Sequence, residues 1–436
     1  ASFIFYGSWN YAFISLLVFS AVSDYLIARQ IEANDHDQVM RKRWLVLSMV
    51  INLGVLGIFK YSNFVLQSVA DFVGLFGVEA SIPTLSIILP VGISFYTFQS
   101  MSYTIDVYRR DMKAHKGFLE FLAALSFFPQ LVAGPILRAQ HILPQLDVMP
   151  VPTWSNVRVG LMLVVAGLIK KTFADLMAGP AAAAFDADVA VSSLDAWIGA
   201  LAFTAQIYGD FSGYTDIAIG IALIMGFHIP QNFNLPYFSV SPVDFWRRWH
   251  ISLSTWLRDY LYISLGGNRT GHRMRNVFIT MLLGGLWHGA AWTFVFWGAW
   301  HGVIITATHW LTETRIGRWV TAHNTLLVRV LKMAFTFYLV VIGWVFFRAT
   351  SFGNAWDMLQ QMHGIGALPA AAAGSALVMA LVVAGLVFMH VLDWARMRYS
   401  DALEAREWLL WPLLVLGFFM TLLVGDPGHD FIYFQF

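Results

Sequence analysis

Long apolar runs dominate the sequence, and polar residues collect between them. A helix of about 20 apolar residues is long enough to cross the roughly 30 Å hydrocarbon core of a bilayer. This pattern predicts an all-α, polytopic membrane protein of about eleven helical segments that cross or enter the membrane. The runs fall near residues 11–28, 45–66, 86–105, 118–137, 158–178, 196–226, 276–290, 291–312, 327–347, 376–394 and 408–425.

Composition supports the membrane assignment. Of the 436 residues, 58% are hydrophobic and only 12% are charged, which is too apolar for a soluble protein of this length. No internal repeat or long linker divides the runs, so we predict a single membrane domain over residues 1–436. The first residues are apolar without a basic stretch before them, which is not a signal-peptide pattern. We interpret them as the end of an earlier span.

Two further features of the composition exclude classes of function. The net charge of +1 gives no global field that would attract nucleic acid, so we expect no nucleic-acid partner. The chain contains no cysteine, which excludes disulfides, thiolate metal sites and a cysteine nucleophile within it. The histidines other than His250 and His288, which are discussed below, show no spacing typical of metal ligands. The HExxH, phosphate-loop and GxSxG motifs are absent from the sequence. We therefore predict no metal site and no bound cofactor.

Basic residues orient the predicted helices, because Lys and Arg collect on the cytoplasmic side of membrane proteins. The loop 180–195 contains three aspartates and no basic residue, so we place it outside. The basic groups that we place inside are Arg41, Lys42 and Arg43; Arg109, Arg110, Lys113 and Lys116; the six arginines between 247 and 275; Arg315 and Arg318; and Arg396, Arg398 and Arg406.

The same orientation requires two apolar segments to enter the membrane and return. Residues 109–116 and 138–155 both belong inside, so 118–137 turns back, as Pro129, Gly134 and Pro135 permit. Residues 228–275 and 313–326 also belong inside, so 276–312 forms a hairpin that turns within the membrane. His288 lies close to the apex of this predicted hairpin.

His288 is an ionisable residue in the otherwise apolar run 284–292. Ionisable groups in membrane segments usually face a protein interior or a wet cavity and often lie on substrate or proton paths. The flanking glycines Gly284, Gly285 and Gly289 leave room for a close-packed helix or for the approach of a substrate. The alternative is a buried histidine that is bonded to a neighbour and has a structural role only. The expected turn between His288 and His301 leaves cooperation between them open.

A second polar stretch includes Asn232 and Asn234 and continues into residues 241–259. Ser241 can cap a helix, Pro242 suits its first position and Asp244 completes a start that resembles a capping box. We predict an amphipathic helix at the cytoplasmic face, with Trp246, Trp249, His250, Leu253 and Leu257 on its apolar side. An interfacial anchor with snorkelling arginines is the alternative. His250 on the apolar side weakens that alternative.

A third stretch, 206–216, places Asp210 and Asp216 in one predicted membrane helix. Buried carboxylates need cationic partners, and we favour a structural role over a catalytic one for this pair. Gly209 and Gly213, four residues apart, indicate close helix packing. The expected partners of the aspartates are the nearest arginines, Arg247, Arg248 and Arg258.

These stretches resemble the membrane-bound O-acyltransferase family, and most closely its bacterial branch of alginate O-acetylation. The resemblance is carried by residues 206–214, 232–237, 244–256, 286–289 and 431–436 and covers most of the chain. It implies a helical ring with a thin centre, a cytoplasmic pocket for an acyl donor and a tunnel to an acceptor outside. It also assigns the catalytic histidine to His288, a second polar position to His250, and the catalytic core to residues 206–301.

The chemistry of the residues agrees with the resemblance, because a neutral imidazole can take the proton of a hydroxyl that attacks a thioester. We therefore predict an enzyme that moves an acetyl group from a cytoplasmic thioester to a hydroxyl outside, for exopolysaccharide acetylation. One alternative is a membrane transporter in which the histidine relays protons. Another is an acyltransferase of the same family that acts on a lipid, a protein or a D-alanyl group. The predicted supporting residues are Trp287, Gly285, Trp246, Arg247, Asp210, Asn232 and Asn234.

The predicted partners follow from the loops. The longest outward loop, 348–375, is rich in small and apolar residues and offers no evident groove for a long sugar polymer. The arginine-rich cytoplasmic segment suits a phosphate-bearing donor, either acetyl-CoA or an acyl carrier protein. We expect membrane lipid around the chain, an extracytoplasmic acetyltransferase relay protein outside it, and a location in the bacterial inner membrane.

Overall fold

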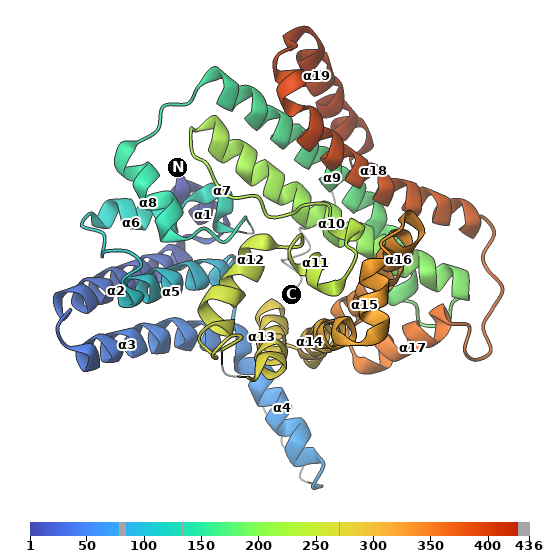
Figure 1. Ribbon diagram of the computed structural model, residues 1–436, viewed down its shortest axis with the longest axis horizontal. Coiled ribbons are helices and arrows are strands. Elements are labelled where there is room, and N and C mark those ends of the chain that lie inside the picture. Colours follow the sequence, from blue (N-terminus) through green and yellow to red (C-terminus); the bar gives the residue numbers. More distant parts are fainter. Residues whose placement is uncertain (78–83, 133, 270, 426–436) are drawn as a thin grey trace. The chain divides into compact units, whose positions relative to one another are not determined.

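The computed structural model describes residues 1–77, 84–132, 134–269 and 271–425 (Figure 1). Within these ranges the chain forms helices and turns and no β-strand, which confirms the predicted all-α class. Residues 431–436, part of the resemblance above, lie outside the described residues. The helical segments that are long and apolar enough to cross a membrane are Ser2–Ala33, Gln38–Gly74, Leu326–Arg348, Ser375–Glu404 and Glu407–Val424.

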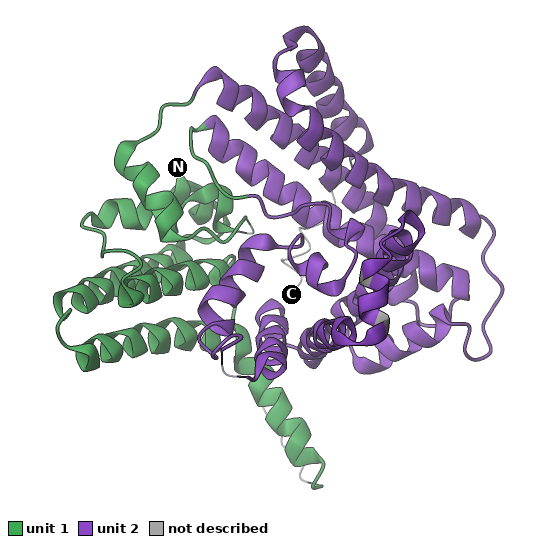
Figure 2. Cartoon of the chain, viewed as in Figure 1, with its two compact units in different colours: residues 1–152, 225–230 green, residues 153–224, 231–436 purple. Residues whose placement is uncertain are grey.

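The chain divides into two compact units (Figure 2). The first comprises Ala1–Pro152 and Met225–Pro230, and the second comprises Thr153–Ile224 and Gln231–Phe436. The helices of the first unit are α1 (Ser2–Asn10), α2 (Ile14–Ala33), α3 (Gln38–Leu56), α4 (Ser62–Gly74), α5 (Ile93–Arg109), α6 (Phe118–Leu125), α7 (Phe128–Leu131) and α8 (Ala139–Val148).

Helices α2, α3 and α5 pack together around a buried carboxylate in the first unit. Asp24 is fully buried, and its oxygens accept hydrogen bonds from Ser48 (2.6 Å), Asn52 (2.7 Å) and Ser100. The described residues of the segment 118–137 form the short helices α6 and α7. Pro129 lies in the first turn of α7. At about 1.5 Å per residue neither helix could cross a bilayer, as the prediction of a returning segment requires.

The second unit contains the predicted core segment. Its helices are α9 (Trp154–Phe185), α10 (Ser193–Ile224), α11 (Pro242–Trp246), α12 (Ile251–Trp256), α13 (Arg273–His288), α14 (Trp292–Glu313), α15 (Arg315–Ala322), α16 (Leu326–Arg348), α17 (Phe352–Met362), α18 (Ser375–Glu404) and α19 (Glu407–Val424). The short helices α15 and α17 lie outside the predicted runs.

Glycines bring α9 and α10 into close contact along their length, side by side in Figure 1. A Cβ atom on Gly167 would lie 2.5 Å from the carbonyl oxygen of Gly213, and one on Gly213 would lie 2.7 Å from that of Gly167. Gly160 of α9 and Gly220 of α10 make the same reciprocal contact at a second point along the two helices. The prediction of close helix packing at Gly209 and Gly213 is thus confirmed.

The single amphipathic helix predicted over 242–259 is wrong, because the structure breaks it into two. Ser241 caps α11 by accepting from the Asp244 N–H at 3.1 Å, as predicted, but α11 ends at Trp246. His250 has a positive φ of 43°, and α12 begins after it. Asn232 explains the break, because its backbone oxygen accepts from Ile251 N and its side-chain oxygen from Ser252 N. These bonds start a new helix.

Candidate active site

His288 is the last residue of α13, and the chain turns over residues 289–291 before α14 runs back. The predicted hairpin with His288 at its apex is therefore present. Its placement within the membrane stays a prediction. The glycines serve the close approach of the two helices: a Cβ atom on Gly285 would lie 2.3 Å from Phe294 O and 2.9 Å from the Cα of Gly298. His288 itself is buried.

His250 lies beside His288, with 6.3 Å between the two ring centroids. The Nδ1 atom of His250 is 3.2 Å from Asn232 Oδ1, which also accepts from the backbone N–H and the hydroxyl of Ser252. Because the Ser252 N–H can only donate, the Asn232 atom it meets is the oxygen. His250 therefore donates through Nδ1, and its Nε2 atom carries the lone pair. Burial lowers the pKa of His250 to about 3, so this imidazole is neutral at physiological pH.

Aromatic rings form the walls around His288. The rings of Trp287 and Trp297 lie 5.0 Å from it and that of Phe347 lies 5.5 Å away, all edge to face. His301 belongs to the same cluster, because its ring lies 4.8 Å from Trp297. The sequence left cooperation between His288 and His301 uncertain, whereas the structure brings both against one tryptophan.

Trp246 connects this cluster to a pocket. Its indole nitrogen donates to His301 Nδ1 at 3.1 Å, and the same side chain lines a pocket of about 290 Å³. Basic residues from three segments surround the pocket, and none of the described residues that line it is acidic. These basic residues are Arg247, Arg258, Arg273 and His309, and the apolar wall includes Leu257, Met281 and Ile305.

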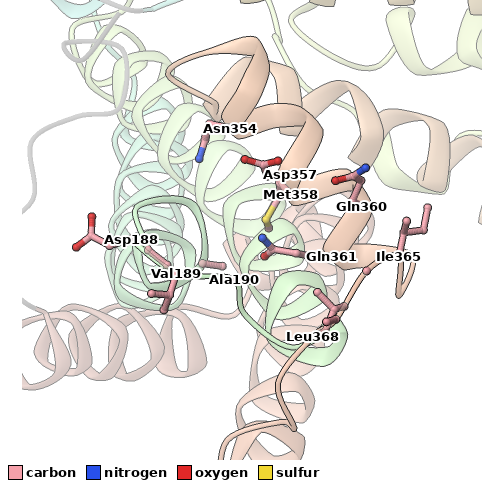
Figure 3. A pocket seen from close by; sticks show the side chains of 14 residues that line it. Asp188, Val189, Ala190, Asn354, Asp357, Met358, Gln360, Gln361, Ile365 and Leu368 are labelled. Atoms are coloured by element: carbon pink, nitrogen blue, oxygen red, sulfur yellow. The ribbon is translucent and has the colours of Figure 1, made fainter.

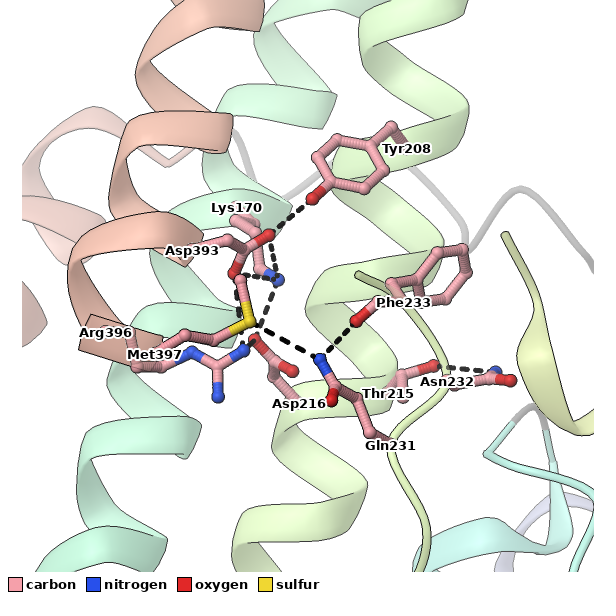
Figure 4. Close-up of polar contacts among 10 residues, drawn as sticks. All are labelled: Lys170, Tyr208, Thr215, Asp216, Gln231, Asn232, Phe233, Asp393, Arg396 and Met397. Atoms are coloured by element: carbon pink, nitrogen blue, oxygen red, sulfur yellow. Dashed lines mark hydrogen bonds and ion pairs between the residues drawn. The ribbon is translucent and has the colours of Figure 1, made fainter. Parts of the chain in front are cut away.

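The predicted partners of Asp210 and Asp216 are wrong. Asp216 pairs with Lys170 at 2.7 Å (Figure 4). Asp210 pairs with Lys171 at 2.9 Å, and both lysines belong to α9. The arginines have other partners: Arg248 bonds Asp244 and Arg258 bonds Asp259, while Arg247 is exposed. The lysines interrupt the run 158–178 at adjacent positions, and this interruption was the signal in the sequence that could have identified them.

The two predicted asparagines differ in their surroundings. Asn232 is fully buried and holds His250, as described above. Asn234 is exposed. Its backbone N–H donates to Arg248 O at 2.9 Å, and its carbonyl oxygen accepts a hydrogen bond from Arg248 Nη1 at 3.4 Å. The structure therefore gives Asn234 a role in shaping the loop rather than in lining the cluster.

A small polar pocket lies beside the predicted outward loop 348–375. It has a volume of about 330 Å³, between the end of α9 and the segment 354–368 (Figure 3). Asp188, Asn354, Asp357, Gln360 and Gln361 line it, and no aromatic side chain is among its described lining residues. The segment 354–368 thus contributes to a small hydrogen-bonding pocket whose described lining includes no aromatic side chain.

Comparison with known proteins identifies the class of the chain. The sequence model of the MBOAT, membrane-bound O-acyltransferase, family matches residues 107–353. The chain is 46% identical to a probable alginate O-acetylase AlgI of Azotobacter vinelandii, over 90% of this chain and 77% of that protein. It is 35% identical to a peptidoglycan O-acetyltransferase of Helicobacter pylori, over 84% of this chain and 73% of that protein. It is 25% identical to a teichoic acid D-alanyltransferase of Bacillus subtilis, over 62% of this chain and 71% of that protein.

Proposed function

This chain belongs to the membrane-bound O-acyltransferase family and is an O-acyltransferase, and from that premise we propose its substrates. We propose that it moves an acetyl group from a thioester donor to a hydroxyl acceptor, as one step in acetylation of an extracellular polysaccharide. The names of the relatives that acetylate alginate and peptidoglycan support this choice. We also propose that the membrane is the bacterial inner membrane, where cytoplasmic thioesters are available on one side.

The observation that carries the proposal is the series of side-chain contacts between the basic pocket and His288. Trp246 lines the pocket, donates to His301, and lies 5.7 Å from Trp297, which contacts His288. A phosphate-bearing donor bound by the arginines would thus have its thioester end directed at an apolar cluster that contains three imidazoles. Such a cluster limits the access of water and so limits hydrolysis of the thioester.

In the proposed reaction His288 is the general base. Its neutral imidazole takes the proton from the acceptor hydroxyl while the hydroxyl oxygen attacks the thioester carbonyl carbon. The new C–O bond forms, the C–S bond breaks, and the proton passes from His288 to the departing sulfur. His250, fixed by Asn232 with its lone pair on Nε2, is the second imidazole that orients the reacting groups.

The basic pocket suits a donor with phosphate groups. Guanidinium groups bind phosphate oxygens through two parallel charged hydrogen bonds, which are stronger than neutral ones. Coenzyme A and the phosphopantetheine arm of an acyl carrier protein both carry such phosphates, and both would place a thioester at the end of an extended chain. We propose no bound cofactor, since either thioester is a substrate.

We propose that the acetyl group leaves the chain on a relay protein outside the membrane. The polar pocket of Figure 3 has a volume of about 330 Å³, which would hold a few side chains or one sugar ring rather than a polymer. A purified chain that acetylates polymer with donor alone, at the rate of intact cells, would contradict this part of the proposal.

Arg247→Gln tests the donor pocket. We expect the KM for acetyl-CoA to rise about ten-fold or more, because a hydrogen bond to a charged group contributes about 1.5–3 kcal/mol, with kcat little changed. The matched control is Arg269→Gln, since Arg269 is also exposed but does not line the pocket. Radiolabelled acetyl transfer by the purified protein is the measurement. Equal KM values for the two variants would count against a phosphate site here.

A further inference from the structure

A group of four charges joins α9, α10 and α18, and three of its members are buried (Figure 4). Lys170 Nζ lies 2.7 Å from Asp216 Oδ2 and 3.0 Å from Asp393 Oδ1, and Arg396 lies 3.5 Å from both carboxylates. Lys170 is 1% exposed, and Asp216 and Asp393 are buried. Two cations and two anions balance, which is the condition for keeping such charges away from water.

Two members of this group lie beyond the part of the chain that the family model matches. The match ends at residue 353, whereas α18 supplies Asp393 and Arg396. Replacing a buried ion pair by apolar residues is often neutral or stabilising, so stability alone gives a weak reason for such a group. A role in holding other residues is a stronger reason, and the contacts of Asp393 indicate which ones.

The link from the charges toward the site is Tyr208 of α10. Its hydroxyl donates to Asp393 Oδ2, and its ring is fully buried. The ring lies 6.0 Å from Phe233 and 6.3 Å from Trp249. Phe233 follows Asn232 in the chain, and Trp249 precedes His250. Tyr208 therefore contacts Phe233, which is next to Asn232 in the chain, and Trp249, which is next to His250.

The conformation of His250 depends on such support. Its φ of 43° lies in the left-handed region, which costs a residue other than glycine of order 1 kcal/mol or more. Surrounding contacts must hold it there. Phe233 and Trp249 lie 5.0 Å apart, and Phe211 contacts both Phe233 at 5.0 Å and His250 at 4.6 Å. This aromatic layer connects Tyr208 to the His250 ring.

We infer that Tyr208, held by Asp393 and Lys170, is a positioning residue for acyl transfer. Through Phe233 and Trp249 it fixes the Asn232–His250 pair beside His288. The helix α18 thus takes part in the reaction without contacting the reacting atoms. The inference rests on the proposed function, because it assigns the tyrosine a task in that same site.

Tyr208→Phe is the direct test, since it removes one oxygen and keeps the ring. We expect kcat for acetyl transfer to fall about 10- to 100-fold, the scale on which small misplacements of reacting groups reduce rates. The KM for the donor should stay within about two-fold, since the residue does not line the basic pocket. The matched control is Tyr6→Phe, which removes the hydroxyl of another buried tyrosine that bonds a backbone oxygen, that of Val91, in the first unit.

A purely structural role would have a different result. It would lower the thermal midpoint of Tyr208→Phe while leaving kcat per folded molecule unchanged, and that result overturns the inference. The double variant Tyr208→Phe/Asp393→Asn adds a second criterion. If Tyr208 acts through Asp393, the double variant loses no more kcat than the worse single variant, whereas additive losses would contradict the connection.

The parent protein and His288→Ala separate this inference from the proposed function. Full activity of His288→Ala would count against the proposed function. A parent that transfers acetyl, an inactive His288→Ala and an unaffected Tyr208→Phe would overturn only the positioning role. Asp393→Asn leaves the charged group unbalanced, so thermal unfolding of this variant is measured as well. If Asp393→Asn does not fold, Tyr208→Phe alone decides the inference.

Discussion

The side-chain oxygen of Asn232 connects the His250 ring to the start of α12 in the candidate site. It accepts from His250, from the backbone of Ser252 and from the hydroxyl of Ser252. One atom thus sets the tautomer of an imidazole and the start of α12. The sequence indicated Asn232 as a supporting residue, but not this connection, because the partners are 18 and 20 residues further along the chain.

Asn232→Ala should therefore reduce both stability and activity. Loss of the acceptor removes the hydrogen bonds of buried donors, and each buried donor left without a partner costs about 1–3 kcal/mol. The thermal midpoint in detergent and the rate of acetyl transfer are the measurements. Asn234→Ala is the matched control and should keep the stability of the parent, since the Asn234 side chain is exposed. Equal midpoints for the two variants would contradict the role of Asn232.

At the scale of elements, the α13–α14 hairpin depends on Gly285 and Gly298. A Cβ atom on Gly298 would lie 2.3 Å from Met281 O, so each glycine admits the backbone of the other helix. This close packing fixes the direction in which the end of α13 presents His288. The glycines near His288 were visible in the sequence, and for Gly285 the structure confirms the helix-packing interpretation.

Gly285→Ala and Gly284→Ala form a matched pair on the same helix. The first places a methyl group 2.3 Å from Phe294 O, and the backbone must shift, which costs about 1–3 kcal/mol of stability. The second meets only the flexible end of Leu257 at 3.1 Å, so it should unfold near the temperature of the parent. Thermal unfolding of both variants tests this. A Gly285→Ala protein as stable as Gly284→Ala would show that the helices are not in contact.

The elements also show where sequence patterns stop being informative. The apolar runs located α9, α10, α13, α14, α16, α18 and α19 because each buries or presents a long apolar surface. The break between α11 and α12 was not predictable from periodicity, since Trp246, Trp249 and His250 keep helical spacing across it. Bonds from a distant asparagine decide that conformation. The lysine partners of Asp210 and Asp216 were missed for a related reason, because proximity in sequence is a poor guide to neighbours across packed helices.

At the scale of the whole molecule, every residue of the candidate site described above belongs to the second unit. The basic pocket, the imidazole cluster and the charged group that holds Tyr208 are connected there through Trp246, Trp297 and the aromatic layer. The predicted orientation places the basic pocket on the cytoplasmic side, and this topology stays a prediction. In our account the pocket binds a donor from inside, and His288 is the base that takes the proton of the acceptor hydroxyl.

The most direct test of this account is acetyl transfer from a radiolabelled thioester by purified His288→Ala protein. A general base contributes about 10²- to 10⁴-fold in rate, so transfer should fall by that factor while the thermal midpoint stays near that of the parent. His323→Ala, which removes an exposed imidazole, should remain active. Transfer by His288→Ala at a rate close to that of His323→Ala would contradict the assignment of His288 as the base.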